Sequence, residues 1–146
     1  MKTIFLIVPL ILLLFSSCGG SVEQSERDKI FNKTLVLAEL DSVKYAENEK
    51  SGEIYIKLNR KEKNKSKGEV QGFAGCNNIF GTFISDIGIV PKFSLMMTEK
   101  FCDKAAIEKK LVELLNNLNM IEVQRTDITY FYSDSPKHKA MFIIRE

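Results

Sequence analysis

Few side chains in this sequence could do covalent chemistry, because it has only three cysteines and one histidine. Cys76 lies in a glycine-rich string, and Cys102 lies just before a segment with helical periodicity. A catalytic thiol needs a lowered pKa, which a histidine, a cation or a helix N-terminus can provide. Lys100 and Lys104 flank Cys102 near the start of the predicted helix. Cys102 is therefore the best candidate for a reactive thiol.

Cys76 and Cys102 leave three interpretations open. They could form a structural disulfide, which would close a loop of about 26 residues and stabilise the fold by roughly 3 kcal/mol. They could remain free thiols that are buried or close together, or one of them could be a functional thiol. Two features argue against a functional thiol. The sequence has no Cys-x-x-Cys motif, and its single histidine, His138, lies in a predicted polar turn.

Other enzyme and cofactor classes find no support in the sequence. A zinc site would require Cys76, Cys102 and His138 to converge with a fourth ligand, whereas zinc motifs pair their ligands within a few residues. The sequence has no Gly-x-Ser-x-Gly motif, no phosphate-binding loop and no dinucleotide fingerprint. We therefore expect no metal, no cofactor and no enzymatic activity.

Cys18 follows an N-terminal segment with the layout of a secretory signal. Lys2 precedes an unbroken apolar run over residues 4–15, and two serines then lead into the cysteine. The run is too short to span a bilayer, which needs about 20 apolar residues. Cys18 resembles the acylated cysteine of a bacterial lipobox, and this resemblance implies lipidation of Cys18. We therefore expect residues 1–17 to be a cleaved lipoprotein signal peptide.

The lipid would also determine where the protein is located. Several acyl chains hold a protein on a membrane, whereas one chain binds only marginally. Residues 18–29 are small or charged and are expected to form a flexible tether, and residues 30–146 are expected to form one domain. The predicted location is the bacterial cell envelope, with the domain facing the periplasm or the exterior.

Composition limits the other partners. The formal net charge is +2, which gives no indication of nucleic-acid binding. Ten phenylalanines and no tryptophan make phenylalanine the main bulky core residue. Apart from the membrane contact through the N-terminal lipid, we expect an unidentified envelope protein or ligand as the partner, and we expect a monomer.

The hydrophobic pattern predicts many strands and one helix. Apolar residues at spacings of three and four between Ile107 and Leu118 predict an amphipathic helix, with Asp103 as its N-cap or first-turn acid and asparagines at its exit. Short connections favour antiparallel pairing. The predicted fold class is therefore α+β, a curled, mostly antiparallel sheet with one amphipathic helix packed across it. Alternating or short apolar runs predict strands at residues 33–40, 53–59, 69–73, 80–84, 89–95, 120–124, 128–132 and 140–144.

Three of these segments carry further expectations. Pro91 restricts the strand at 89–95 to a sheet edge or a strand end. Residues 57–67 carry six basic side chains and one acid, and we interpret them as a solvated hairpin tip, with contact to anionic headgroups as the alternative. Residues 130–132 place aromatic rings on both faces of one strand, so at least one ring should be exposed or cover the helix.

Residues 72–81 form the most unusual local string, because three glycines interrupt a strand-like region. This pattern predicts a sharp turn or a close approach of backbones, with a positive φ at some position. Asn77 and Asn78 can tolerate left-handed geometry and bond nearby amides. A structural turn is the default interpretation, and a ligand-binding nest is the alternative.

Gly75, Cys76 and Asn77, followed by Gly81, form one motif, and Thr98 with Cys102 before the predicted helix forms a second. We interpret these motif residues as structural. The two motifs resemble those of the META domain family, which includes the HslJ-like heat-shock proteins. The resemblance covers about residues 30–144 and implies a compact, β-rich domain with one helix. It also implies frequent export or lipid anchoring, a link to stress tolerance or envelope integrity, and no established catalytic site.

These features together favour a lipid-anchored, non-enzymatic envelope protein that acts as a binding module in stress tolerance or envelope integrity. The alternative is a thiol-dependent redox or repair enzyme that acts through Cys102. A third class, a ligand carrier, would need an apolar cavity inside the curled sheet.

Overall fold

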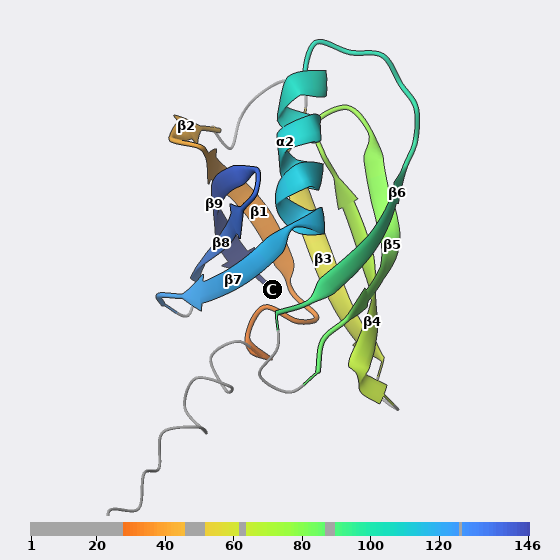
Figure 1. Ribbon diagram of the computed structural model, residues 1–146, viewed down its shortest axis with the longest axis vertical. Coiled ribbons are helices and arrows are strands. Elements are labelled where there is room, and N and C mark those ends of the chain that lie inside the picture. The colour runs from red at the N-terminus through yellow and green to blue at the C-terminus, as the bar shows by residue number, and fades with distance from the viewer. Residues whose placement is uncertain (1–27, 46–51, 62–63, 87–89, 126) are drawn as a thin grey trace, which may run out of the picture.

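The computed structural model describes residues 28–45, 52–61, 64–86, 90–125 and 127–146. Within these residues the strands form one sheet, and helix α2 (Ala105–Asn116) packs across it (Figure 1). The strands in chain order are β1 (Thr34–Leu40), β2 (Val43–Lys44), β3 (Tyr55–Lys61), β4 (Asn64–Phe73), β5 (Asn78–Ile84), β6 (Lys92–Met97), β7 (Leu118–Val123), β8 (Ile128–Asp134) and β9 (Lys137–Arg145).

The sheet has the strand order β6-β5-β4-β3-β1-β9-β8-β7, and β2 pairs with the end of β1. All of these strand pairs are antiparallel. The chain leaves the sheet at the β6 edge, forms α2, and re-enters the sheet at the β7 edge (Figure 1). The predicted α+β class, with a curled antiparallel sheet and one helix across it, is confirmed.

The predicted long hairpin tip at residues 57–67 is wrong. Strand β3 continues to Lys61 and β4 begins at Asn64, so paired strands contain most of the basic run. Backbone pairing needs no apolar side chains, and a polar stretch at the end of a hairpin therefore gives no strand pattern in the sequence. The turn between the strands, residues 62–63, lies outside the described residues.

Helix α2 begins one residue after Lys104, which occupies the N-cap position without a side-chain capping bond. The prediction that Asp103 would be the N-cap or a first-turn acid is therefore wrong, and the acid of the first turn is Glu108. Asn117 is the C-cap, as the asparagine-rich exit predicted. Neither α2 nor any other helix in the described part of the chain is long and apolar enough to cross a bilayer.

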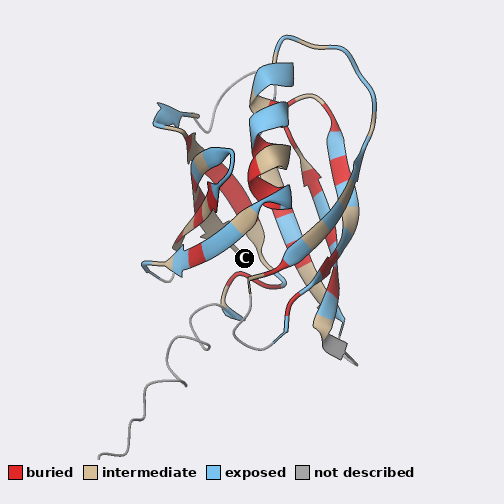
Figure 2. Cartoon of the chain, viewed as in Figure 1, coloured by how far each residue is buried: buried red, intermediate tan, exposed pale blue. Residues whose placement is uncertain are grey.

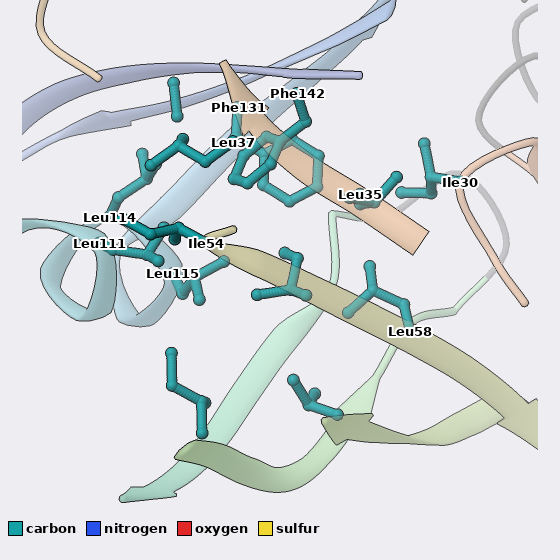
Figure 3. Packing of buried hydrophobic residues seen from close by; sticks show 14 of the residues in the cluster. Ile30, Leu35, Leu37, Ile54, Leu58, Leu111, Leu114, Leu115, Phe131 and Phe142 are labelled. Atoms are coloured by element: carbon teal, nitrogen blue, oxygen red, sulfur yellow. The ribbon is translucent and has the colours of Figure 1, made fainter. Parts of the chain in front are cut away.

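The core lies between α2 and the concave face of the sheet (Figure 3). Leu111, Leu114 and Leu115 of the helix belong to the same buried cluster as Phe131 and Phe142 of the sheet, and all five are almost fully buried. The helix face that carries these leucines is buried and its opposite face is exposed (Figure 2). The apolar stripe found in the sequence is therefore the face that holds the helix on the sheet.

Candidate functional site

The glycine-rich corner connects β4 to β5, and its geometry depends on two glycines. Gly75 has a φ of +104°, a conformation that other residues rarely adopt. Gly81 lies where β5 approaches β6 so closely that a Cβ atom would clash with the carbonyl oxygen of Ser94. Asn77 and Asn78 are not among the residues with positive φ, so the prediction of left-handed geometry applies to Gly75 instead.

Asn77 fixes this corner to the helix. It is 4% exposed, and its backbone N–H donates to Oε2 of Glu108 at 2.8 Å. Its side-chain Nδ2 donates to Oε1 of the same carboxylate at 2.9 Å. Glu108 is itself 7% exposed, so two hydrogen bonds from one residue compensate part of the cost of burying its carboxylate.

Asn77 also binds the segment that leads from β6 to α2. The hydroxyl of Thr98 donates to Oδ1 of Asn77 at 2.8 Å, and the backbone N–H of Lys100 donates to the same oxygen at 2.7 Å. Nδ2 additionally donates to the carbonyl oxygen of Lys100 at 3.2 Å, and the Asn77 carbonyl accepts from the Ala74 N–H at 2.9 Å. Every polar group of Asn77 is therefore hydrogen-bonded within the fold.

Cys76 and Cys102 form a disulfide beside Asn77, with their Cα atoms 6.1 Å apart. The sequence left three interpretations of these cysteines open, and the structure agrees with the first of them, a disulfide. The bond joins the same two segments that the Asn77 hydrogen bonds join, so a covalent and a polar link reinforce each other.

The structure thus brings Cys76, Asn77, Thr98 and Cys102 together where β5, β6 and α2 meet, and Gly81 lies further along β5 beside β6. The hydrogen bonds of Asn77 and the disulfide form a structural clasp between these segments. Glu108, which binds Asn77 in this clasp, was not predicted from the sequence. Its position offered a signal, because it lies three residues before Leu111 and seven before Leu115, on the buried face of the helix.

His138 lies in β9, and the prediction that it occupies a polar turn is wrong. Its side chain is 10% exposed, with Nδ1 at 2.9 Å from Asp41 Oδ2 and Nε2 at 3.4 Å from Glu113 Oε2. A doubly protonated imidazole can donate to both carboxylates, whereas the neutral ring can donate to only one. His138 therefore links the turn after β1 to α2, and it lies in a different cluster from the disulfide.

Asp41 is the centre of this second cluster. Burial raises the pKa of its carboxyl group, but hydrogen bonds from the Lys139 amide, His138 and Lys110 lower it more in sum, so the net pKa lies below its ordinary value. Asp41 and Ser42 both have positive φ and form the tight turn between β1 and β2. Lys110 of α2 also reaches this cluster, since its ammonium lies 3.2 Å from Asp41 Oδ2.

Tyr130 and Tyr132 lie on the sheet face opposite Phe131. Phe131 is fully buried, and the two tyrosine rings are partly exposed with their centroids 6.3 Å apart. The Lys139 ammonium lies over both rings. Burial, with a hydrogen bond to and the charge of Glu122, raises the pKa of Tyr132 to about 12. The prediction that a ring would be exposed or cover the helix is correct only in part, because Tyr130 and Tyr132 are both half-buried.

The basic run of residues 57–67 has its own partners. Arg60 stacks on the ring of Phe31 at 3.5 Å and pairs with Asp28, and Lys61 pairs with Glu69 at 3.0 Å. These contacts neutralise part of the positive charge that binding to anionic headgroups would require.

We also searched the described residues for surface depressions and for groups of side chains that could bind a metal ion. An open depression of about 600 Å³ adjoins His138 and Asp41, lined by charged and polar side chains and by Met120. Within the described residues, no group of three or more histidine, cysteine or acidic side chains could hold a metal ion. Cys18, the predicted lipidation site, lies outside the described residues.

A curled antiparallel sheet closed by one helix, with a disulfide clasp between its glycine corner and the start of the helix, defines a class of small β-rich domains. The META domain family model matches residues 29–141, so this chain belongs to the META domain family. This confirms the resemblance found in the sequence.

One solved structure is similar to this fold. It is an NMR structure of a protein from Burkholderia xenovorans, with a TM-score of 0.58 and 16% sequence identity, and the match covers 81% of this chain and 87% of that chain. At this identity the likeness shows the fold alone. A search among curated proteins found no match.

Proposed function

We propose that this protein is a lipid-anchored, non-enzymatic module of the bacterial cell envelope that binds other envelope components under stress. The proposal rests on one observation, which is that the side chains of the META motif are bonded to one another and to α2. Asn77, Thr98 and Glu108 bind one another, and Cys76 is bonded to Cys102. A motif whose polar and sulfur groups are all engaged in holding segments together favours a scaffold over a reaction centre.

The alternative, a thiol-dependent enzyme acting through Cys102, would need a thiolate at that position. The disulfide with Cys76 removes that thiol in this form of the protein. The ligand-carrier class finds little support either, because leucine and phenylalanine side chains pack the space between α2 and the sheet (Figure 3).

The anchor is tested by metabolic labelling of bacteria that produce the protein with a radioactive or alkyne-tagged fatty acid. The proposal predicts label on the wild-type chain and none on the Cys18→Ser variant, which should leave the membrane fraction. Equal labelling of both chains would exclude Cys18 as the anchor.

Binding is tested by capture from detergent-solubilised envelope membranes, before and after heat or osmotic stress. A matched variant with the domain unfolded by Phe131→Asp serves as the control, because Phe131 is fully buried. The proposal predicts partners that the wild type captures reproducibly and the control does not. No difference between the two would reject the binding function.

A further inference from the structure

We propose that the end of the sheet where β3 and β4 turn lies on the anionic headgroups of the membrane that carries the lipid anchor. The proposal rests on the lipid anchoring proposed above and deepens it by assigning the surface of the domain that faces the bilayer. Two observations carry it: an exposed row of basic and apolar side chains, and the attachment of the N-terminal segment at the same end of the sheet.

The row crosses three neighbouring strands. Lys67 of β4 pairs with Ile84 of β5, and Ile84 pairs with Lys92 of β6. Residues that lie directly opposite each other on adjacent strands are on the same face of a sheet. All three side chains are exposed, and Ile84 is 52% exposed. The adjacent Phe83 is buried in the core, so the row lies on the face that points away from α2.

The two lysines of the row keep their charge available. Neither Lys67 nor Lys92 forms an ion pair with another residue in the described part of the chain. Two acids lie near the row. Glu69 pairs with Lys61 at 3.0 Å, and Asp86 follows β5 by two residues.

The charge of the chain is distributed unevenly, and its positive part lies at this end. Residues 57–67 contain six basic side chains and one acid, a charge of +5, in a chain whose formal net charge is +2. The remainder of the chain therefore has a net charge of −3. Lys57, Lys61 and Lys67 are exposed positions within this run. An anionic surface attracts this end of the domain and repels the rest.

The N-terminal segment joins the domain at the same end. Asp28, the first residue that the structure describes, pairs with Arg60 near the end of β3 at 2.6 Å. Cys18 precedes Asp28 by ten residues, and a flexible tether of this length has an end-to-end distance of about 18 Å.

The opposite end of the sheet is further from the anchor. Strand β4 runs from the hairpin to the glycine-rich corner beside the start of α2, and its ten residues span about 33 Å (Figure 1). A lipid on Cys18 therefore places the basic end next to the bilayer and the disulfide clasp away from it.

A bilayer surface fits the row better than a protein partner does. Lysine stems cover apolar surface while their ammonium groups reach toward phosphates, and an isoleucine can enter the boundary between headgroups and acyl chains. The next row, Thr82 and Ser94, is polar, so this face lacks the apolar centre of a standard protein interface. A weak contact is sufficient here, because the tether raises the local concentration of headgroups.

The test uses the acylated full-length protein in vesicles. The chain has no tryptophan, so Ile84→Trp introduces a single fluorophore into the row. The vesicles contain phosphatidylcholine brominated on its acyl chains, with or without phosphatidylglycerol. We expect bromine to quench the fluorescence by about half or more in the anionic vesicles, and little quenching without phosphatidylglycerol or at high salt.

Two controls locate the contact. Phe101→Trp carries the fluorophore at the opposite end, where Phe101 is fully exposed, and should not be quenched. Adding Lys67→Glu and Lys92→Glu to Ile84→Trp should reduce quenching at least about threefold. The matched reversal of two exposed lysines elsewhere, Lys100→Glu with Lys137→Glu, should leave quenching unchanged.

Three results would overturn the proposal: no quenching at position 84, equal quenching at positions 84 and 101, or quenching that persists after reversal of Lys67 and Lys92. Flotation of the vesicles separates this outcome from failure of the anchor. A wild-type chain that does not float with the vesicles would reject the lipid anchor, and this orientation with it. A chain that floats without quenching at position 84 would reject the orientation alone.

Discussion

Asn77 is a buried polar residue whose hydrogen bonds join the glycine-rich corner to α2 and to the segment that precedes it. Its side chain and backbone hold three segments that are far apart in the sequence, because its partners lie up to 31 positions away. Buried hydrogen bonds contribute modestly when they are intact, but the cost is large when one partner is removed and the others stay buried.

The first prediction concerns this residue. Asn77→Ala keeps the backbone bond to Glu108 but removes the side-chain bonds to Glu108 Oε1, to the Thr98 hydroxyl and to the Lys100 amide. It should lower the free energy of unfolding by about 3 kcal/mol, because these groups stay buried without a partner. Urea denaturation measures the change. Asn78→Ala is the matched control, because its exposed side chain should contribute less than about 0.5 kcal/mol. Similar losses for both variants would contradict the clasp.

Asp41 leads to a prediction about pH. Its pKa in the folded state is below the unfolded value of about 3.9, so the native state binds fewer protons in acid. The stabilisation is therefore fully present above that value and is lost as the pH falls through the lower folded pKa. Asp41→Asn keeps a side chain that tolerates positive φ, and it should reduce the loss of stability between pH 5 and pH 2.

The measurement is the free energy of unfolding against pH for wild type and variant. Asp103→Asn is the control, since this side chain is exposed and lies outside the cluster. Parallel curves for wild type and Asp41→Asn would show that Asp41 makes no such contribution.

At the scale of elements, the sequence predicted those with a strong apolar pattern. The stripe on α2 and the alternation in β3 both predicted the observed element, since burial of one face produces both pattern and structure. The first half of β4 and the two-residue β2 were missed, because main-chain pairing at a polar hairpin end has no side-chain signature. Elements that are held only by backbone pairing cannot be predicted from the periodicity of apolar side chains.

The next prediction tests how α2 is held on the sheet. Leu114→Ala removes a fully buried side chain from the core and should cost about 3 kcal/mol of stability. Lys109→Ala is the control on the exposed face of the same helix, where the ion pair with Glu113 is worth little. Thermal unfolding of both variants distinguishes them, and equal shifts in Tm would contradict the packing.

At the scale of the whole molecule, the candidate site was predicted only in part. The motif residues were found in the sequence, but their convergence with Glu108 depends on how α2 crosses the sheet. The His138 cluster was missed because its carboxylates lie 97 and 25 positions away, on separate elements. Contacts across such separations arise from the fold and leave no local pattern.

The disulfide provides a prediction at this scale. Replacing Cys76 and Cys102 together by alanine should lower the free energy of unfolding by roughly 3 kcal/mol, because a closed loop restricts the unfolded chain. The fold should persist, since Asn77 still joins the same segments. Chemical denaturation with and without reductant measures the loss in wild type, and the double variant should be insensitive to reductant.

The same double variant tests most directly whether the META motif supports the fold or performs chemistry. The measurement is the survival of cells lacking the wild-type gene under envelope stress, with the double variant supplied at a temperature where circular dichroism shows it folded. If the motif is structural, the double variant should rescue the cells as well as the wild type does. Failure to rescue by a folded, correctly located variant would show instead that the sulfur chemistry itself is needed.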